Sequence, residues 1–147
     1  MLQHAKFSCD GATSKNSRSL RHIAIADVNP TYEVHMQAQN IAQLNDRFRK
    51  GDPAVLGKSF ITAGIVQLLT EQKSPISDLL DLLIAYLDFT EDNDPYDEHD
   101  FGAFEFGGKK CFWKIDYFDT EYKMGADDAA DLAKTRRVLT IMLAEEW

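Results

Sequence analysis

The chain has 147 residues, of which 44% are apolar, and its 24 acidic and 16 basic side chains leave a net charge of -8. This length suits a single domain with its own core, and the composition excludes wholesale disorder. The negative charge argues against nucleic acid as a direct ligand, and no apolar run approaches the ~20 residues of a membrane span. The only two cysteines, Cys9 and Cys111, form no metal or disulfide pattern, so we expect a cytoplasmic protein.

Residues 1–30 differ from the rest of the chain, because they are polar over residues 14–19 and show no helical period. We predict a mobile or loosely docked arm over 1–30, in which Ile23, Ile25 and Val28 form a short edge strand or an extended lead-in. A single domain is expected over 31–147.

The first predicted elements of this domain are a helix, a strand and a second helix. Apolar residues at helical spacing predict a helix over Thr31–Lys50, with the polar residues 45–47, 49 and 50 facing water. Strand-forming residues predict a strand over Lys58–Ile65. Ser74-Pro75 is typical of a helix start, and the leucines that follow indicate a helix buried on more than one side.

Gly107-Gly108 predicts a two-residue hairpin turn between two strands. The resulting register pairs Gly102 with Trp113, and it places Trp113 on a core face where Gly102 leaves room for the indole. Continued outward, the register sets His99 opposite Asp116. Asp127 and Asp128 then predict the start of a last helix, whose apolar contacts come from Ala130, Ala133, Val138, Ile141 and Met142. The predicted fold is α+β: a small three-stranded antiparallel sheet with helices packed on one face, in the order α-β-α-β-β-α.

Two groups of residues suggest chemistry. A carboxylate opposite an imidazole can orient a general base, so His99 and Asp116 are candidate catalytic residues, although a cross-strand pair that only fixes the register is the more common arrangement. The loop that precedes the hairpin carries six carboxylates within residues 91–100, which are ligands of the kind that hard cations prefer. The Asp92-x-Asp94 start resembles an EF-hand loop, but Asp97 occupies the position of the required glycine. Arg136-Arg137 is interpreted as a solvated pair.

Four segments of the chain are distinctive: Asn45-Asp46-Arg47-Phe48-Arg49, Asn93-Asp94-Pro95-Tyr96-Asp97-Glu98-His99-Asp100-Phe101-Gly102, Phe112–Tyr117 and Thr135–Glu146. Together they resemble a small proteobacterial family known as domain-of-unknown-function family 3768. The resemblance runs from about Ile41 to Trp147. It implies a small cytosolic domain, often encoded on plasmids and other mobile DNA, and it brings no activity, ligand or cofactor.

We therefore base the expected function on the distribution of charge along the chain. Residues 74–147 carry eighteen acidic and seven basic side chains. This excess favours a non-catalytic interaction protein that binds a basic protein surface, such as a mobile-element inhibitor of a host nucleic-acid-handling or defence (CRISPR-type) complex. The expected partner-binding residues are Asp92, Asp94, Asp97, Glu98, His99, Phe101, Lys114 and Asp116. The alternatives are a small enzyme that uses His99 and Asp116, with or without a cation in the 91–100 loop, and a binding domain for a small molecule.

Overall fold

The computed structural model describes residues 29–147, so the predicted arm lies outside the described residues, apart from its last two positions. Residues Val34–Trp147 form one compact unit, and the description below concerns this unit. Within residues 29–147, no helix is both long and apolar enough to pass through a bilayer.

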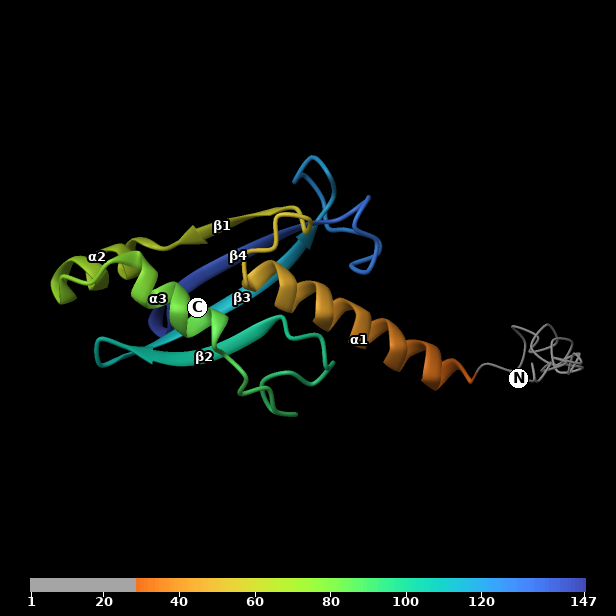
Figure 1. The fold of residues 1–147 in the computed structure, drawn as a ribbon, viewed down its shortest axis with the longest axis horizontal. Coiled ribbons are helices and arrows are strands. Elements are labelled where there is room, and N and C mark those ends of the chain that lie inside the picture. The colour runs from red at the N-terminus through yellow and green to blue at the C-terminus, as the bar shows by residue number, and fades with distance from the viewer. Residues whose placement is uncertain (1–28) are drawn as a thin grey trace, which may run out of the picture. The chain divides into compact units, whose positions relative to one another are not determined.

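Within the described residues, four strands form one mixed sheet: β1 (Gly57–Ile61), β2 (Phe101–Phe106), β3 (Lys109–Phe118) and β4 (Arg136–Leu143). Their order across the sheet is β1-β4-β3-β2 (Figure 1). Strand β4 pairs in parallel with β1 and antiparallel with β3, while β2 and β3 form the hairpin. The α+β class is confirmed, but the predicted three-stranded antiparallel sheet is wrong, because β4 adds a strand that joins β1 to the hairpin.

The predicted last helix is also wrong, because its C-terminal part forms strand β4. Residues 127–135 form turns, and Arg136–Leu143 is a strand. Every second side chain from Arg137 to Leu143 is buried, which is the period of a strand with one face on the core. Asp128 starts no helix, and its carboxylate instead accepts a hydrogen bond from the amide of Ala130 at 2.9 Å.

The first helix, α1 (Pro30–Arg49), lies within one residue of its predicted bounds at each end. The predicted strand 58–65 is too long, because α2 (Ala63–Gln72) begins within it and was not expected. Helix α3 (Ile76–Ile84) follows Pro75 as predicted. It is buried on one side only, since Leu79 and Leu83 face the core while Leu80, Leu82, Ile84 and, beyond its end, Leu87 are exposed.

The main core lies between the helices and one face of the sheet, and Figure 1 shows α3 and the C-terminal part of α1 in front of the strands. Helices α2 and α3 contribute aliphatic side chains, and the sheet contributes alternate residues of β3 and β4. The buried members of this core are Ile65, Leu68, Leu79, Leu83, Tyr86, Cys111, Trp113, Ile115, Leu139, Ile141 and Leu143. Side chains of the intervening strand residues point to the opposite face of the sheet.

The hairpin register is confirmed from Phe101–Lys114 to Phe106–Lys109. Gly107 and Gly108 both have positive φ, at 57° and 75°, as a tight turn of this kind requires. Trp113 is fully buried, and its indole, with the ring of Tyr86, fills the space that a side chain at Gly102 would need. The predicted pairing of His99 with Asp116 is wrong, because His99 has a φ of 54° and lies outside β2.

Candidate functional site

The imidazole of His99 lies against the C-terminal half of α1 rather than against β3. Its Nδ1 is 3.0 Å from Oδ2 of Asp46, and its ring stacks on Phe89 with centroids 3.8 Å apart and planes within 3°. The other carboxylate oxygen of Asp46 accepts a hydrogen bond from Arg49 at 2.9 Å. The carboxylate that orients His99 is therefore Asp46, while Asp116 forms an ion pair with Lys114 at 2.9 Å on the opposite face of the sheet.

Asp94 shapes the acidic loop from within. Its carboxylate is buried and accepts hydrogen bonds from the backbone amides of Glu98 and His99 at 3.0–3.2 Å. These bonds hold a tight loop in which Asp97 also adopts a positive φ of 60°. Asp94 is thus a structural carboxylate, which leaves Asp92 and Asp97 as the exposed acids among the predicted partner-binding residues of this loop.

One arrangement in the loop has the geometry of a metal site. Ligand atoms of Asp94, Asp97 and His99 all lie within 4.8 Å of one another. Carboxylate oxygens and an imidazole nitrogen suit a divalent cation. Since both oxygens of Asp94 already accept backbone hydrogen bonds, a cation here would compete with the bonds that shape the loop.

A buried polar network connects α1, the acidic loop, β3 and β4. Asn45 is fully buried and donates to the carbonyl of Glu98 at 2.8 Å and to the hydroxyl of Tyr117 at 2.6 Å. Its side-chain oxygen accepts from Nε of Arg137 at 2.7 Å, and Nη2 of Arg137 donates to the carbonyl of Ala129 at 2.7 Å. The hydroxyl of Tyr117 in turn lies 3.3 Å from the Glu98 carboxylate.

Burial of this network shifts the ionisation of its members. Burial raises the pKa of Glu98 and of the Tyr117 hydroxyl, and it lowers the pKa of Arg137. Burial, reinforced by the negative charges of Glu98 and Asp94, raises the pKa of the neighbouring Asp100 to about 6. Asp100 therefore keeps its proton to a higher pH than an exposed aspartate does, mainly because it is buried and secondly because other carboxylates lie near it.

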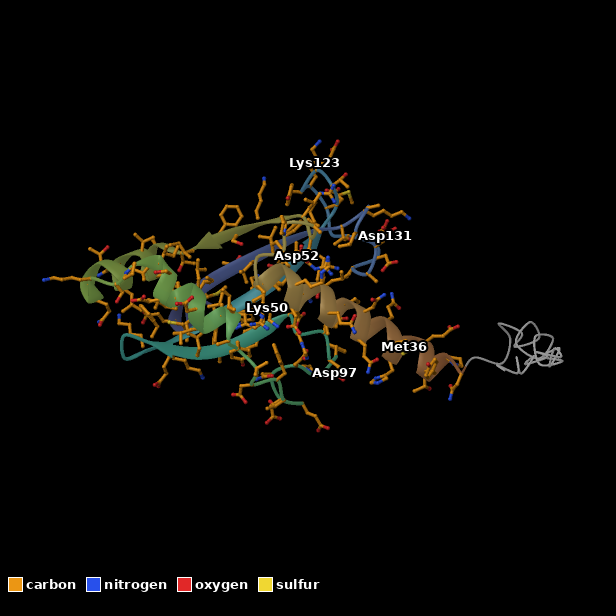
Figure 2. All side chains as sticks on the ribbon, viewed as in Figure 1. Met36, Lys50, Asp52, Asp97, Lys123 and Asp131 are labelled. Carbon is orange, nitrogen blue, oxygen red and sulfur yellow. The ribbon has the colours of Figure 1, made fainter. Side chains whose placement is uncertain are left out.

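The outer surface of α1 is hollowed on two sides. One open cavity of about 360 Å³ is lined by Gln39, Ala42, Gln43, Asp46, Asp97 and His99. A second, of about 460 Å³, is lined by Met36, Gln37, Gln39, Asn40, Gln43, Asp128 and Ala130. Figure 2 shows Asp97 and Asp131 in the loops on the two sides of α1. Acidic loops thus flank a helix surface that is rich in side-chain amides.

The predicted partner-binding residues fall on two separate surfaces. Asp92, Asp94, Asp97, Glu98 and His99 belong to the loop beside α1, whereas Phe101, Lys114 and Asp116 lie on the sheet face that points away from the core. The loop residues Asp94 and Glu98 both take part in internal hydrogen bonds, and Asp94 is buried while Glu98 is half-buried.

Four residues that hold the site were predicted to face water: Asn45, Asp46, Arg49 and Arg137. Asn45 and Arg137 are fully buried, and Arg49 donates to the carbonyl of Leu83 beneath α3. The signal that could have identified two of them is spacing, since Asn45 and Arg49 follow the buried Ile41 at successive intervals of four residues. For Arg137 the signal is the alternation along a strand, since Arg137 lies two residues before Leu139 and four before Ile141, both of which face the core.

Fold and site together define a small α+β domain whose single mixed sheet has helices on one face and an acidic, histidine-containing loop at its edge. The chain belongs to the family described as "Protein of unknown function (DUF3768)", whose model matches residues 61–146. The match covers α2, α3 and strands β2 to β4. It begins after α1, so the expected resemblance over residues 41–60 is not part of it. No curated protein and no solved structure matches the chain.

Proposed function

We propose that this chain is a non-catalytic, cytoplasmic interaction protein that binds the basic surface of a protein partner through its acidic loops. The partner class that best fits such a surface is a nucleic-acid-handling or defence (CRISPR-type) complex, with this chain as a mobile-element inhibitor. The observation that carries the proposal is the placement of acidic loops on both sides of α1, with Asp92, Asp97 and Asp127 exposed to solvent.

Rigidity of the acidic loop supports this proposal. The loop is tied to the rest of the domain by the hydrogen bonds of Asp94 and by the contact of Asn45 with the carbonyl of Glu98. A preorganised loop loses less conformational entropy when it binds than a flexible one does. Its exposed carboxylates can therefore act as a fixed array of negative charge opposite a groove that otherwise holds phosphates.

The test measures association between the purified chain and a CRISPR-type complex, together with the ability of the complex to bind its nucleic acid. We expect competition with the nucleic acid, and an association rate that falls as salt rises, because the screening length shrinks to about 8 Å at physiological ionic strength. The double variant Asp92→Lys/Asp97→Lys should slow association, with little change in the dissociation rate.

Asp78→Lys/Asp81→Lys is the matched control, because it also reverses two exposed carboxylates, but on α3, away from the loops. If the Asp92→Lys/Asp97→Lys variant associates as fast as the unmodified chain at low salt, then the acidic loop is not the binding surface. If the chain leaves nucleic-acid binding unchanged in every such complex tested, the proposed target class is wrong.

A second candidate function is a small enzyme in which His99 is a general base. The observation that favours it is the 3.0 Å contact between His99 and Asp46 at the edge of the 360 Å³ cavity. Against it, Nε2 of His99 lies 3.9 Å from Oδ2 of Asp94, so the second nitrogen faces a buried carboxylate.

The two functions separate on two variants. His99→Gln and Asp46→Asn should abolish the activity of an enzyme, whereas an interaction protein should retain binding in both if it still folds. The cation variant of this candidate is tested by titrating Ca²⁺, Mg²⁺ or Mn²⁺ into the chain and into Asp97→Asn. Tight binding that Asp97→Asn removes would favour the enzyme, and no binding would disfavour its metal-dependent form.

A further inference from the structure

The sheet face that points away from the main core carries aromatic and basic side chains. Three lysines and one arginine of the strands point to this face, against two carboxylates: Lys58, Lys110, Lys114 and Arg136, against Glu105 and Asp116. These strand residues therefore carry a local charge of +2 in a chain whose net charge is -8. The net charge does not show this difference between the acidic loops on the helical side and the basic sheet face.

One row of side chains crosses this face over all four strands. Strand pairing places Phe101 next to Lys114, Lys114 next to Thr140, and Thr140 next to Phe60. Three strand spacings separate the outer two rings, or about 14 Å. Phe60 is 53% exposed although it belongs to a strand of the sheet.

Trp147 provides a second exposed ring at the other side of the row. It is 69% exposed and packs edge-on against Phe101 and Phe112, with ring centroids 5.3 and 5.7 Å away. Nζ of Lys114 lies 5.8 Å from the centre of the Trp147 ring and is also paired with Asp116. A cation thus lies between two exposed aromatic groups, Phe60 and Trp147.

This combination has a specific chemical meaning. An exposed ring on a sheet offers a stacking surface to any nucleobase, and a lysine between two such rings can meet the phosphate that joins stacked bases. A duplex cannot use the rings, because its bases are already stacked and paired. The carboxylates of an acidic protein would match the lysines, but they offer no stacking surface to the exposed rings of Phe60 and Trp147.

We propose that the sheet face formed by Phe60, Lys114 and Trp147, with Lys58 and Lys110 beside it, binds single-stranded nucleic acid. This inference does not depend on the acidic loops, which lie on the helical side. The net charge of the whole chain argues against nucleic acid as a ligand, but the local charge of this sheet face is positive. The rings supply stacking energy without reading sequence, and the lysines supply a salt-dependent contribution.

The test is fluorescence anisotropy with labelled oligothymidylate and oligouridylate of about ten nucleotides at low salt. Phe60→Ala should weaken binding between about fivefold and a hundredfold, the range expected for the loss of one stacked base. Lys114→Gln should weaken binding and reduce the slope of log affinity against log salt. Leu87→Ala and Lys73→Gln are the matched controls, because they remove an exposed apolar side chain and a lysine from outside this face.

Intrinsic fluorescence provides an independent measurement. Trp113 is fully buried and Trp147 is exposed, so quenching by a stacked base should come from Trp147 and should disappear in Trp147→Phe. Three results would overturn the proposal: no binding to either oligomer, equal binding to a duplex of the same length, or unchanged binding by Phe60→Ala. Sedimentation that shows a dimer dissociated by Phe60→Ala would also overturn it, since the face would then be an interface between two copies of this chain.

Discussion

Replacement of Asn45 by alanine tests whether the buried network holds α1 against the sheet. The change removes three hydrogen bonds: two donated by Asn45, to the Glu98 carbonyl and to the Tyr117 hydroxyl, and one accepted from Arg137. The loss matters most for Arg137, because its Nη1 has no hydrogen-bond partner within the described residues even before the substitution. Asn45→Ala would leave its buried guanidinium with the carbonyl of Ala129 as its remaining hydrogen-bond acceptor.

The expected cost follows from the groups that are stranded. A buried polar group that loses its hydrogen-bond partner costs about 1–3 kcal/mol, and more if the group is charged. Because Asn45 is neutral and the group it leaves without a partner is the guanidinium of Arg137, we expect Asn45→Ala to lower the free energy of unfolding by about 3 kcal/mol, measured by urea denaturation with the slope m compared between variants.

Asn40→Ala is the matched control, because it makes the same change at an exposed position of the same helix. It should change the free energy of unfolding by less than about 0.5 kcal/mol. A loss below about 1 kcal/mol in Asn45→Ala would refute the reasoning, since it would mean that Arg137 finds water or another acceptor and that the network does not anchor α1.

Three further predictions concern the hairpin, the acidic loop and the start of α2. Gly102→Val should destabilise the fold by about 1–3 kcal/mol in the same assay, because its side chain would overlap the indole of Trp113, whereas Gly125→Ala meets no atom within 4 Å and should be neutral. Burial raises the pKa of Asp100 to about 6 from 3.8, so the folded state favours the protonated carboxyl and gains stability as the pH falls from about 7 towards 5. Asp100→Asn should raise stability at pH 7 and remove that gain. A pH profile of stability that is the same in Asp100→Asn would contradict the raised pKa of Asp100. Glu146 accepts hydrogen bonds from Thr62, Gly64 and Leu143, which lower its pKa, so Glu146→Ala should accelerate amide hydrogen exchange at Gly64, while Glu145→Ala should not.

The hairpin was predictable because its signals are local. A Gly-Gly turn sets the register, and burial of Trp113 opposite Gly102 selects it over a slip by one residue. The error began at His99, where a residue other than glycine takes a left-handed conformation. The Asp94 carboxylate holds the amide of His99 there, and nothing in the alternation of the strand reveals that interaction.

The last strand was not predictable by the same means. Residues 136–143 fit both periods, and a buried arginine at 137 made the inward face of a strand look polar. What decides the conformation is long-range, because β4 completes its hydrogen bonds with β1 and β3 and Arg137 obtains its acceptor from Asn45 on α1. Buried polar residues that need a distant partner are therefore the positions at which sequence patterns mislead most.

The place of β4 in the sheet also sets the order in which the domain can assemble. Strand β1 leaves the ribosome before the other strands of this sheet, but among residues 29–147 its one partner strand is β4, which joins residue 57 to residue 137. Until β4 has been synthesised, the hairpin and β1 have no strand to connect them, so the two halves of the sheet cannot cooperate. Because loop closure over that distance is slow, we expect the pairing of β1 with β4 to be a late step. A nascent chain halted before Arg136 leaves unpaired the edges of β1 and β3 that β4 would cover, and exposes them to chaperones and to other chains.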